Sequence, residues 1–134
     1  MDILETQTNR KILFVVDKEG NTGKTELSIY MKVMKGAGLY QNGKSADLAM
    51  MCRMEKTVVF DLCRTNVDSM NWGIIENMKN GTVQSSKYES KMKLFVSPKM
   101  VVMMNEPPKT DALSADRYSY MYISEGGKYT VEGL

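Results

Sequence analysis

The sequence contains no histidine and only two cysteines among its 134 residues. Zinc sites in proteins are built mostly from histidine and cysteine, so a Cys/His zinc site is excluded. The absence of histidine also excludes the Ser-His and Cys-His pairs that activate nucleophiles in hydrolases. Cys52 and Cys63 could pair, but two cysteines behind an N-terminus without a secretory signal are typical of free thiols in a reducing compartment.

Long apolar runs and a strong charge of one sign are absent as well. No apolar segment is long enough to cross a lipid bilayer. The formal net charge of +2 is too small to indicate nucleic-acid binding, which would depend on local clusters of lysine and arginine. We expect a single domain over residues 11–123, with the end of a preceding helix or a linker in residues 1–10 and a tail in residues 124–134.

Methionine, in contrast, is abundant, with thirteen copies that stand mostly in apolar runs. Because its unbranched side chain adapts to irregular gaps, we expect these residues to fill the core. The examples are Met50, Met51, Met54, Met100, Met103 and Met104.

Apolar runs alternate along the chain with segments of helical periodicity. The predicted strands are residues 11–17, 39–41, 56–61, 99–104 and 118–123, the predicted helices are residues 24–35, 45–54 and 67–80, and the predicted hairpin arms are residues 82–84 and 93–96. This alternation favours an α/β fold with a mostly parallel central sheet, flanked by helices and carrying a β-hairpin insertion. Ligands bind at the carboxyl ends of the strands in such sheets.

A candidate phosphate-binding loop follows the first predicted strand. The segment after Asp17 contains two glycines and closes on Gly-Lys-Thr, and a helical pattern comes next. Backbone N–H groups of such a loop wrap a phosphate, while Lys24 can reach the β- and γ-phosphates and the Thr25 hydroxyl can ligate Mg²⁺. The full pattern has glycine where this chain has Lys18, and the alternative is a chance Gly-Lys-Thr in a surface turn.

Polar side chains end two further predicted strands. Asp61 follows an apolar run, as the Mg²⁺-holding acid of P-loop nucleotidases does. Asn105 follows another, and its amide could orient the attacking water or contact the γ-phosphate. The alternatives are an ordinary aspartate at a strand end and a turn residue before Pro107.

Two groups of cations are candidates for contacts with nucleotide or DNA. Arg117 could act as an arginine finger across a subunit interface, or it could pair locally with Asp116 or another surface acid. Lys87 is expected near the hairpin tip, either as a solvated lysine or as a contact to a nucleic-acid backbone. Tyr88 could then stack on a base, and Lys91 and Lys93 could extend the positive patch.

These motifs, in this order, resemble the superfamily 3 helicase domain of Rep replication initiator proteins from small circular single-stranded DNA viruses, above all nanoviruses and alphasatellites. The resemblance covers most of the chain, from Asp2 to Ile123. The matching segments are residues 20–25 for Walker A, 58–61 with Arg64 for Walker B, 81–89 for the B′ hairpin, 102–105 for motif C and 114–117 for the arginine finger.

The resemblance implies an ATP-dependent DNA helicase with an AAA+-like P-loop core that acts in rolling-circle replication in the host nucleus. It implies that Thr25 and Asp61 hold the Mg²⁺ of ATP, that Asn105 senses the γ-phosphate, and that Arg117 reaches the ATP of a neighbouring subunit. Lys87 would face single-stranded DNA in the pore of a ring, commonly a hexamer, that moves 3′ to 5′. The residues expected to bind ATP are Gly20, Asn21, Thr22, Gly23, Lys24 and Thr25.

The sequence departs from the family pattern in two ways. Asp61 is followed by Leu62, whereas many superfamily members end the Walker B strand with two acids, so Glu106 could assist. Nothing resembles the nicking domain of full Rep proteins, which has metal-binding histidines. Two alternatives to a helicase remain open. One is a nucleotide-binding assembly or DNA-binding module with little ATPase activity, and the other is a small-molecule P-loop kinase, which the scarcity of arginine disfavours.

Overall fold

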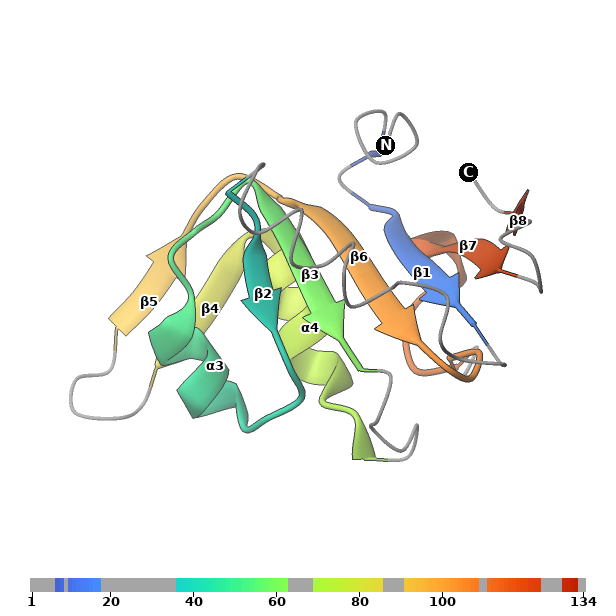
Figure 1. The fold of residues 1–134 in the computed structure, drawn as a ribbon. Coiled ribbons are helices and arrows are strands. Elements are labelled where there is room, and N and C mark those ends of the chain that lie inside the picture. Colours follow the sequence, from blue (N-terminus) through green and yellow to red (C-terminus); the bar gives the residue numbers. More distant parts are fainter. Residues whose placement is uncertain are drawn as a thin grey trace.

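Five parallel strands form the centre of the structure, and their spatial order differs from their order along the chain (Figure 1). The computed structural model describes residues 7–8, 10–17, 36–62, 69–85, 91–108, 111–123 and 129–132. The strands of the main sheet are β1 (Ile12–Val16), β2 (Gly38–Tyr40), β3 (Thr57–Asp61), β6 (Lys99–Met104), β7 (Tyr118–Ile123) and β8 (Tyr129–Glu132). They lie in the order β2-β3-β6-β1-β7-β8, and β8 alone pairs antiparallel with its neighbour.

The central strands are apolar runs because both of their faces are buried, as is typical of parallel sheets. All five residues of β1 are buried. Ile12, Phe14 and Val16 belong to one core cluster, whereas Leu13 and Val15 belong to a second cluster on the opposite face. The strand periodicity of two therefore divides the core into two layers.

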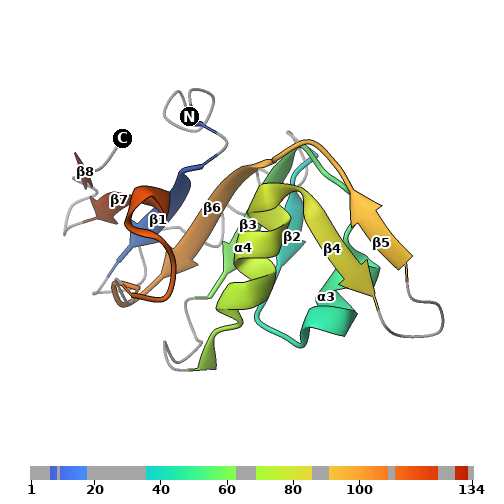
Figure 2. The ribbon, with the colours of Figure 1, turned by 180° about the vertical axis from the view of Figure 1, so that it is seen from behind.

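Two α-helices, α3 (Ser45–Met51) and α4 (Trp72–Asn80), contribute their buried residues to the core cluster that contains Phe14. Figure 2 shows α4 in front of the sheet on this face. The Asn71 side chain caps α4 by accepting a hydrogen bond of 3.2 Å from the Ile74 amide. The helix ends at Gly81, whose φ of +86° is the left-handed conformation that favours glycine. Lys44 is the N-cap residue of α3.

The strands β4 (Thr82–Ser85) and β5 (Lys91–Leu94) form an antiparallel hairpin that is a sheet of its own. The hairpin follows α4 directly, and β4 packs against both α3 and α4. Val83 is buried in the core, so the hairpin rests on the helices through β4. The predicted insertion is thereby confirmed, although β5 begins two residues earlier than expected.

Several sequence predictions are confirmed, including the strands at 99–104 and 118–123. The predicted helices at 45–54 and 67–80 are shorter, because α3 ends at Met51 and α4 begins at Trp72. The predicted helix at 24–35 lies outside the described residues. None of the described helices combines the length and apolar character needed to span a bilayer.

The structure adds contacts at both chain ends and corrects one expectation about the core. Within residues 124–134, β8 pairs with β7. Within residues 1–10, Gln7 is buried. Met50, Met51 and Met54 are about half exposed, whereas Met100, Met103 and Met104 are in the core as expected. Cys52 is buried with a free thiol, and Cys63 is outside the described residues.

Candidate nucleotide site

Three polar side chains lie at the carboxyl edge of the parallel sheet, at or just after the ends of adjacent strands. The Asp17 amide donates to the Met104 carbonyl over 2.9 Å, so β1 and β6 end level with each other. On the other side of β6, Asp61 pairs with Met103. Asn105 directly follows β6. The sequence prediction that Asp17, Asp61 and Asn105 would converge is confirmed at the level of the backbone.

The three residues also share one face of the sheet by strand alternation. Asp17 continues the series of Leu13 and Val15, and Asp61 continues that of Val59. Asn105 continues the series of Val101 and Met103. All of these apolar residues belong to the second core cluster, on the face opposite to α4. A ligand at this edge would therefore meet an acid from β1, an amide from β6 and an acid from β3.

The connections of the chain also favour this edge as a binding site. Along the chain, β1 is followed by β2, which is the far edge strand beyond β6 and β3, whereas β6 is followed by β7, on the other side of β1. The chain order therefore reverses next to β1, and such switch points are where open α/β sheets bind ligands. Neighbouring strands lie about 4.8 Å apart, which places the end of β3 about 10 Å from the start of the predicted loop.

The three residues differ in their exposure to solvent. Asp17 is fully buried, whereas Asp61 and Asn105 are half-buried, with the Asn105 Oδ1 atom inside. Leu62, where many superfamily members have a second acid, is buried. Its amide donates to the Met103 carbonyl over 2.8 Å, which extends the ladder between β3 and β6 by one residue. Glu106 is exposed and follows Asn105.

Most of the other predicted contact residues lie outside the part of the chain that the structure describes. They are Gly20, Asn21, Thr22, Gly23, Lys24, Thr25, Arg64, Lys87 and Tyr88. Lys91 begins β5 and pairs with Ser85 at the tip end of the hairpin. Lys93 does not extend a positive patch there, because its ammonium bonds to carbonyl groups of α3.

Arg117 lies at the opposite edge of the sheet from Asp61 and Asn105. It ends the short 3-10 helix η2 (Ala115–Arg117), and the next residue, Tyr118, pairs with Ile12 at the start of β1. A five-residue strand is about 16 Å long, so Arg117 and the carboxyl edge of the same chain are well separated. Within one chain, the structure does not bring Arg117 to the candidate nucleotide site.

The Arg117 side chain is fully buried and bonded inside its own chain. One terminal nitrogen donates to the Arg10 carbonyl over 3.2 Å, and the other donates to Asn80 Oδ1. The Nε atom is 3.8 Å from a Glu76 carboxylate oxygen. Burial lowers the pKa of the guanidinium, and the nearby charge of Arg10 adds to this effect. Asp116 pairs with Arg10 instead, over 2.8 and 2.9 Å, so the local acid of Arg117 is Glu76 and not Asp116.

A second buried cation, Lys79, was not singled out by the sequence pattern. Its ammonium donates to Gln7 Oε1 over 2.6 Å and to the Pro98 carbonyl over 2.8 Å. The Gln7 amide also pairs with both backbone groups of Met100, which extends the ladder of β6 sideways. Burial, together with the charges of Lys99 and Arg117, lowers the pKa of Lys79 to about 7. This cluster holds the N-terminal segment against the sheet.

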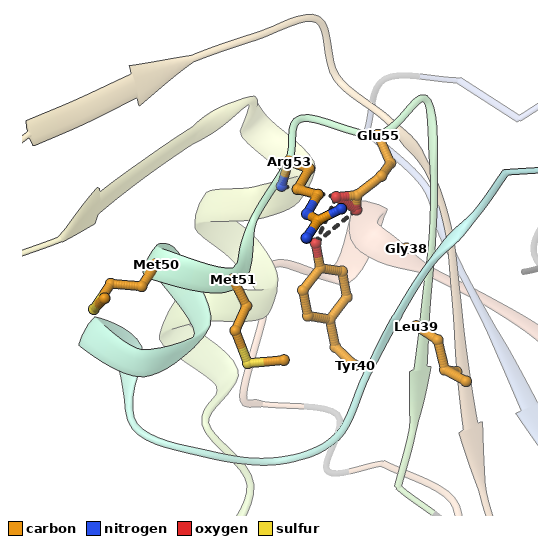
Figure 3. A pocket seen from close by; sticks show the side chains of 7 residues that line it. All are labelled: Gly38, Leu39, Tyr40, Met50, Met51, Arg53 and Glu55. Atoms are coloured by element: carbon orange, nitrogen blue, oxygen red, sulfur yellow. Dashed lines mark hydrogen bonds between the residues drawn. The ribbon is translucent and has the colours of Figure 1, made fainter.

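A pocket of about 310 Å³ opens beyond the edge strand β2, away from the candidate nucleotide site (Figure 3). Its walls come from β2, from Met50 and Met51 of α3, and from the segment that leads into β3. The Tyr40 hydroxyl donates to the Glu55 carboxylate, whose oxygens lie 2.6 and 2.7 Å away. Burial and this carboxylate raise the pKa of Tyr40. None of Asp17, Asp61 and Asn105 lines the pocket, which is therefore distinct from the candidate nucleotide site.

Comparison with known proteins identifies relatives of this sequence. The chain is 32% identical over 120 residues to the master replication protein of Faba bean necrotic yellows virus, and 34% identical over 116 residues to that of Banana bunchy top virus. It is 29% identical over 127 residues to Para-Rep C9 of an alphasatellite of Faba bean necrotic yellows virus. These matches cover 90%, 87% and 91% of the chain, but only 42%, 41% and 45% of the relatives.

No protein-family model matches the chain. The chain spans less than half of the length of the curated relatives that it matches. The resemblance to nanovirus and alphasatellite replication proteins is thereby confirmed. The names of these relatives do not mention a helicase, so the predicted helicase activity stays a prediction. Over most of its length, the chain is a homologue of nanovirus master replication proteins and alphasatellite para-Rep proteins.

Proposed function

We propose that the chain is the ATP-driven motor of a viral replication initiator, a superfamily 3 helicase domain that moves along single-stranded DNA. The observation that carries this proposal is the convergence of Asp17, Asp61 and Asn105 at the topological switch point of a parallel sheet. The predicted phosphate loop begins one residue after Asp17. The relatives named master replication proteins support the role in replication. By the family resemblance, the proposed place of this replication is the host nucleus.

In this proposal, each residue at the carboxyl edge has a separate task. Lys24 contacts the β- and γ-phosphates of ATP, while Thr25 and Asp61 hold Mg²⁺ between them. The Mg²⁺ ion neutralises charge on the phosphate oxygens during transfer. The position of Asp61 suits this task, because it is half-exposed at the edge and lies on the same face as Asp17, the residue that follows β1. Asn105 orients the attacking water or contacts the γ-phosphate.

The hairpin carries the proposed contacts to DNA. Lys87, Tyr88 and Lys91 bind the backbone and bases of single-stranded DNA, and six subunits form a ring around it. The hairpin suits this role because it is a separate sheet that extends from the body of the domain (Figure 1). Arg117 is proposed to contact the ATP of a neighbouring subunit, which requires the guanidinium to leave its partners inside the chain.

The test is ATP hydrolysis with and without single-stranded DNA, measured on the wild-type chain and on the Lys24→Ala and Asp61→Asn variants. We expect DNA to stimulate the wild type and each substitution to lower the turnover number by at least about 100-fold, because each removes a charge that stabilises the transferred phosphoryl group. Asp47→Asn serves as the control, because it makes the same change in the first turn of α3, which is not among the residues that follow β1, β3 or β6. Wild-type activity in the Asp61→Asn variant would contradict the proposed metal site.

A nucleotide-binding module with little turnover is the second candidate, and one observation favours it. Only one carboxylate ends β3, because the next side chain is the buried Leu62. A single acid would have to serve both Mg²⁺ and the attacking water, unless Glu106 assists. Wild-type protein that binds ATP but does not hydrolyse it, at any concentration of protein or DNA, would favour this second candidate.

A further inference from the structure

Few packing contacts fix the position of the β4–β5 hairpin relative to the rest of the domain. Two-stranded sheets are marginally stable in water on their own, so the hairpin depends on packing against the rest of the chain. β4 supplies that packing through Val83 and its contacts with α3 and α4. The outward side chains of β5 do not contribute, because Met92 and Leu94 are 60% and 71% exposed. Beyond β5, Val96 is 86% exposed.

Lys93 lies on the inner face of β5. It pairs with the buried Val83 across the hairpin, so its side chain points toward the helices. The ammonium donates to the Ala49 carbonyl over 3.0 Å and to the Cys52 carbonyl over 2.7 Å. These carbonyls belong to the last turn and the C-cap of α3, and that turn has no basic residue of its own. A cation from β5 thus binds helix-end carbonyls that lack intrahelical partners.

The other connections of β5 to the body of the domain lie at its far end. The Phe95 amide donates to the Gly81 carbonyl over 2.8 Å, and the Phe95 ring packs against the core. These contacts fix the base of the hairpin. Lys93 lies nearer to the other end of β5, two residues after Lys91, with which the strand begins.

We propose that Lys93 is a positioning residue that holds β5, and with it the hairpin, against the end of α3. Lys87 belongs to the sequence between β4 and β5, and the consequence for DNA binding rests on the function proposed above. Lys93 itself does not contact DNA, because its ammonium is already bonded to the two carbonyls of α3.

Hydrogen exchange of the whole chain, without DNA, tests the contact itself. The Lys93→Met variant keeps the length of the side chain and removes its donors. We expect at least about threefold faster exchange in β5 and at the Cys52 amide, which donates to the Leu48 carbonyl at the end of α3. Lys93→Arg should restore the protection, and Lys56→Met, which changes an exposed lysine, should not alter it. Unchanged exchange in Lys93→Met would overturn the proposal.

Fluorescence anisotropy with a thymidine oligonucleotide of about 20 nucleotides, at several salt concentrations, tests the consequence. A positioning role predicts that Lys93→Met weakens binding, that Lys93→Arg restores it, and that the dependence of affinity on salt keeps the wild-type slope. A slope smaller by about one would mean that Lys93 contacts a phosphate, which would overturn the proposal. If the wild type binds no DNA, the proposed function fails, while the exchange result still decides whether Lys93 fixes the hairpin.

Discussion

Lys79 shows how a single buried charge couples the stability of this fold to pH. Its pKa is lowered to about 7 by burial, whereas a lysine in an unfolded chain titrates near 10.4. Between these values the unfolded chain binds a proton that the folded chain does not, so the free energy of unfolding rises with pH. Below pH 7 both states are protonated and the cost of the buried charge is fully present.

We therefore predict that the wild-type chain gains about 1–2 kcal/mol in free energy of unfolding from pH 7 to pH 9, a gain that Lys79→Met abolishes. The gain is smaller than the full pKa difference implies, because Gln7 and the Pro98 carbonyl accept bonds that favour the charged form. Urea denaturation at both pH values measures it. Lys56→Met, at an exposed position, should keep the wild-type slope. Equal slopes in wild type and Lys79→Met would contradict the assignment.

At the scale of elements, the end of α4 and the base of the hairpin depend on one glycine. Gly81 has a φ of +86°, and a Cβ at this position would lie 2.1 Å from the Phe95 carbonyl oxygen. We predict that Gly81→Ala lowers the free energy of unfolding by at least about 2 kcal/mol, since it adds left-handed strain to a backbone clash. Urea denaturation measures the loss.

The matched control is Gly73→Ala in the first turn of the same helix. There a Cβ would meet only the Asn71 side chain, at 3.6 Å, and alanine favours helix over glycine by about 1 kcal/mol. The control should therefore be neutral or stabilising. Equal losses in the two variants would show that the conformation of Gly81 is not what the fold requires.

Local patterns predicted the elements that local chemistry determines. The strand at 99–104 is a continuous apolar run, and Gly81 was correctly predicted to end a helix. β8 was missed because its pairing with β7 is a tertiary contact that a short segment does not reveal. The same holds for Gln7, whose partner Met100 is 93 residues away, and for Lys93, whose direction depends on its register with Val83.

At the scale of the whole molecule, the candidate site could be predicted only in part. The sequence predicted that Asp61 and Asn105 stand at the carboxyl ends of two strands. Because parallel strands bring their carboxyl ends to one edge of the sheet, their common location could be predicted as well. The position of Arg117 could not be predicted from the sequence, because its burial depends on contacts with Arg10, Glu76 and Asn80, which are distant along the chain. A role in a neighbouring subunit and a role inside its own chain therefore make different demands on the same side chain.

A mixture of two inactive variants separates these roles of Arg117. Asp61→Asn lacks a working metal site but keeps Arg117, whereas Arg117→Ala keeps its own site. If Arg117 acts across an interface, as proposed, a mixture of the two should hydrolyse ATP faster than either variant alone, and more so at higher protein concentration. The measurement is the turnover rate across mixing ratios at fixed total protein.

The control is the folded state of Arg117→Ala by itself. The substitution removes bonds to the Arg10 carbonyl and Asn80 and leaves Glu76 without its cation, so we expect the chain to lose about 3 kcal/mol of stability even as a monomer. The mixture must therefore be assayed at a temperature where circular dichroism shows the variant to be folded. If folded Arg117→Ala hydrolyses ATP no faster in the mixture with Asp61→Asn than alone, Arg117 serves the fold of its own chain and another group completes the site.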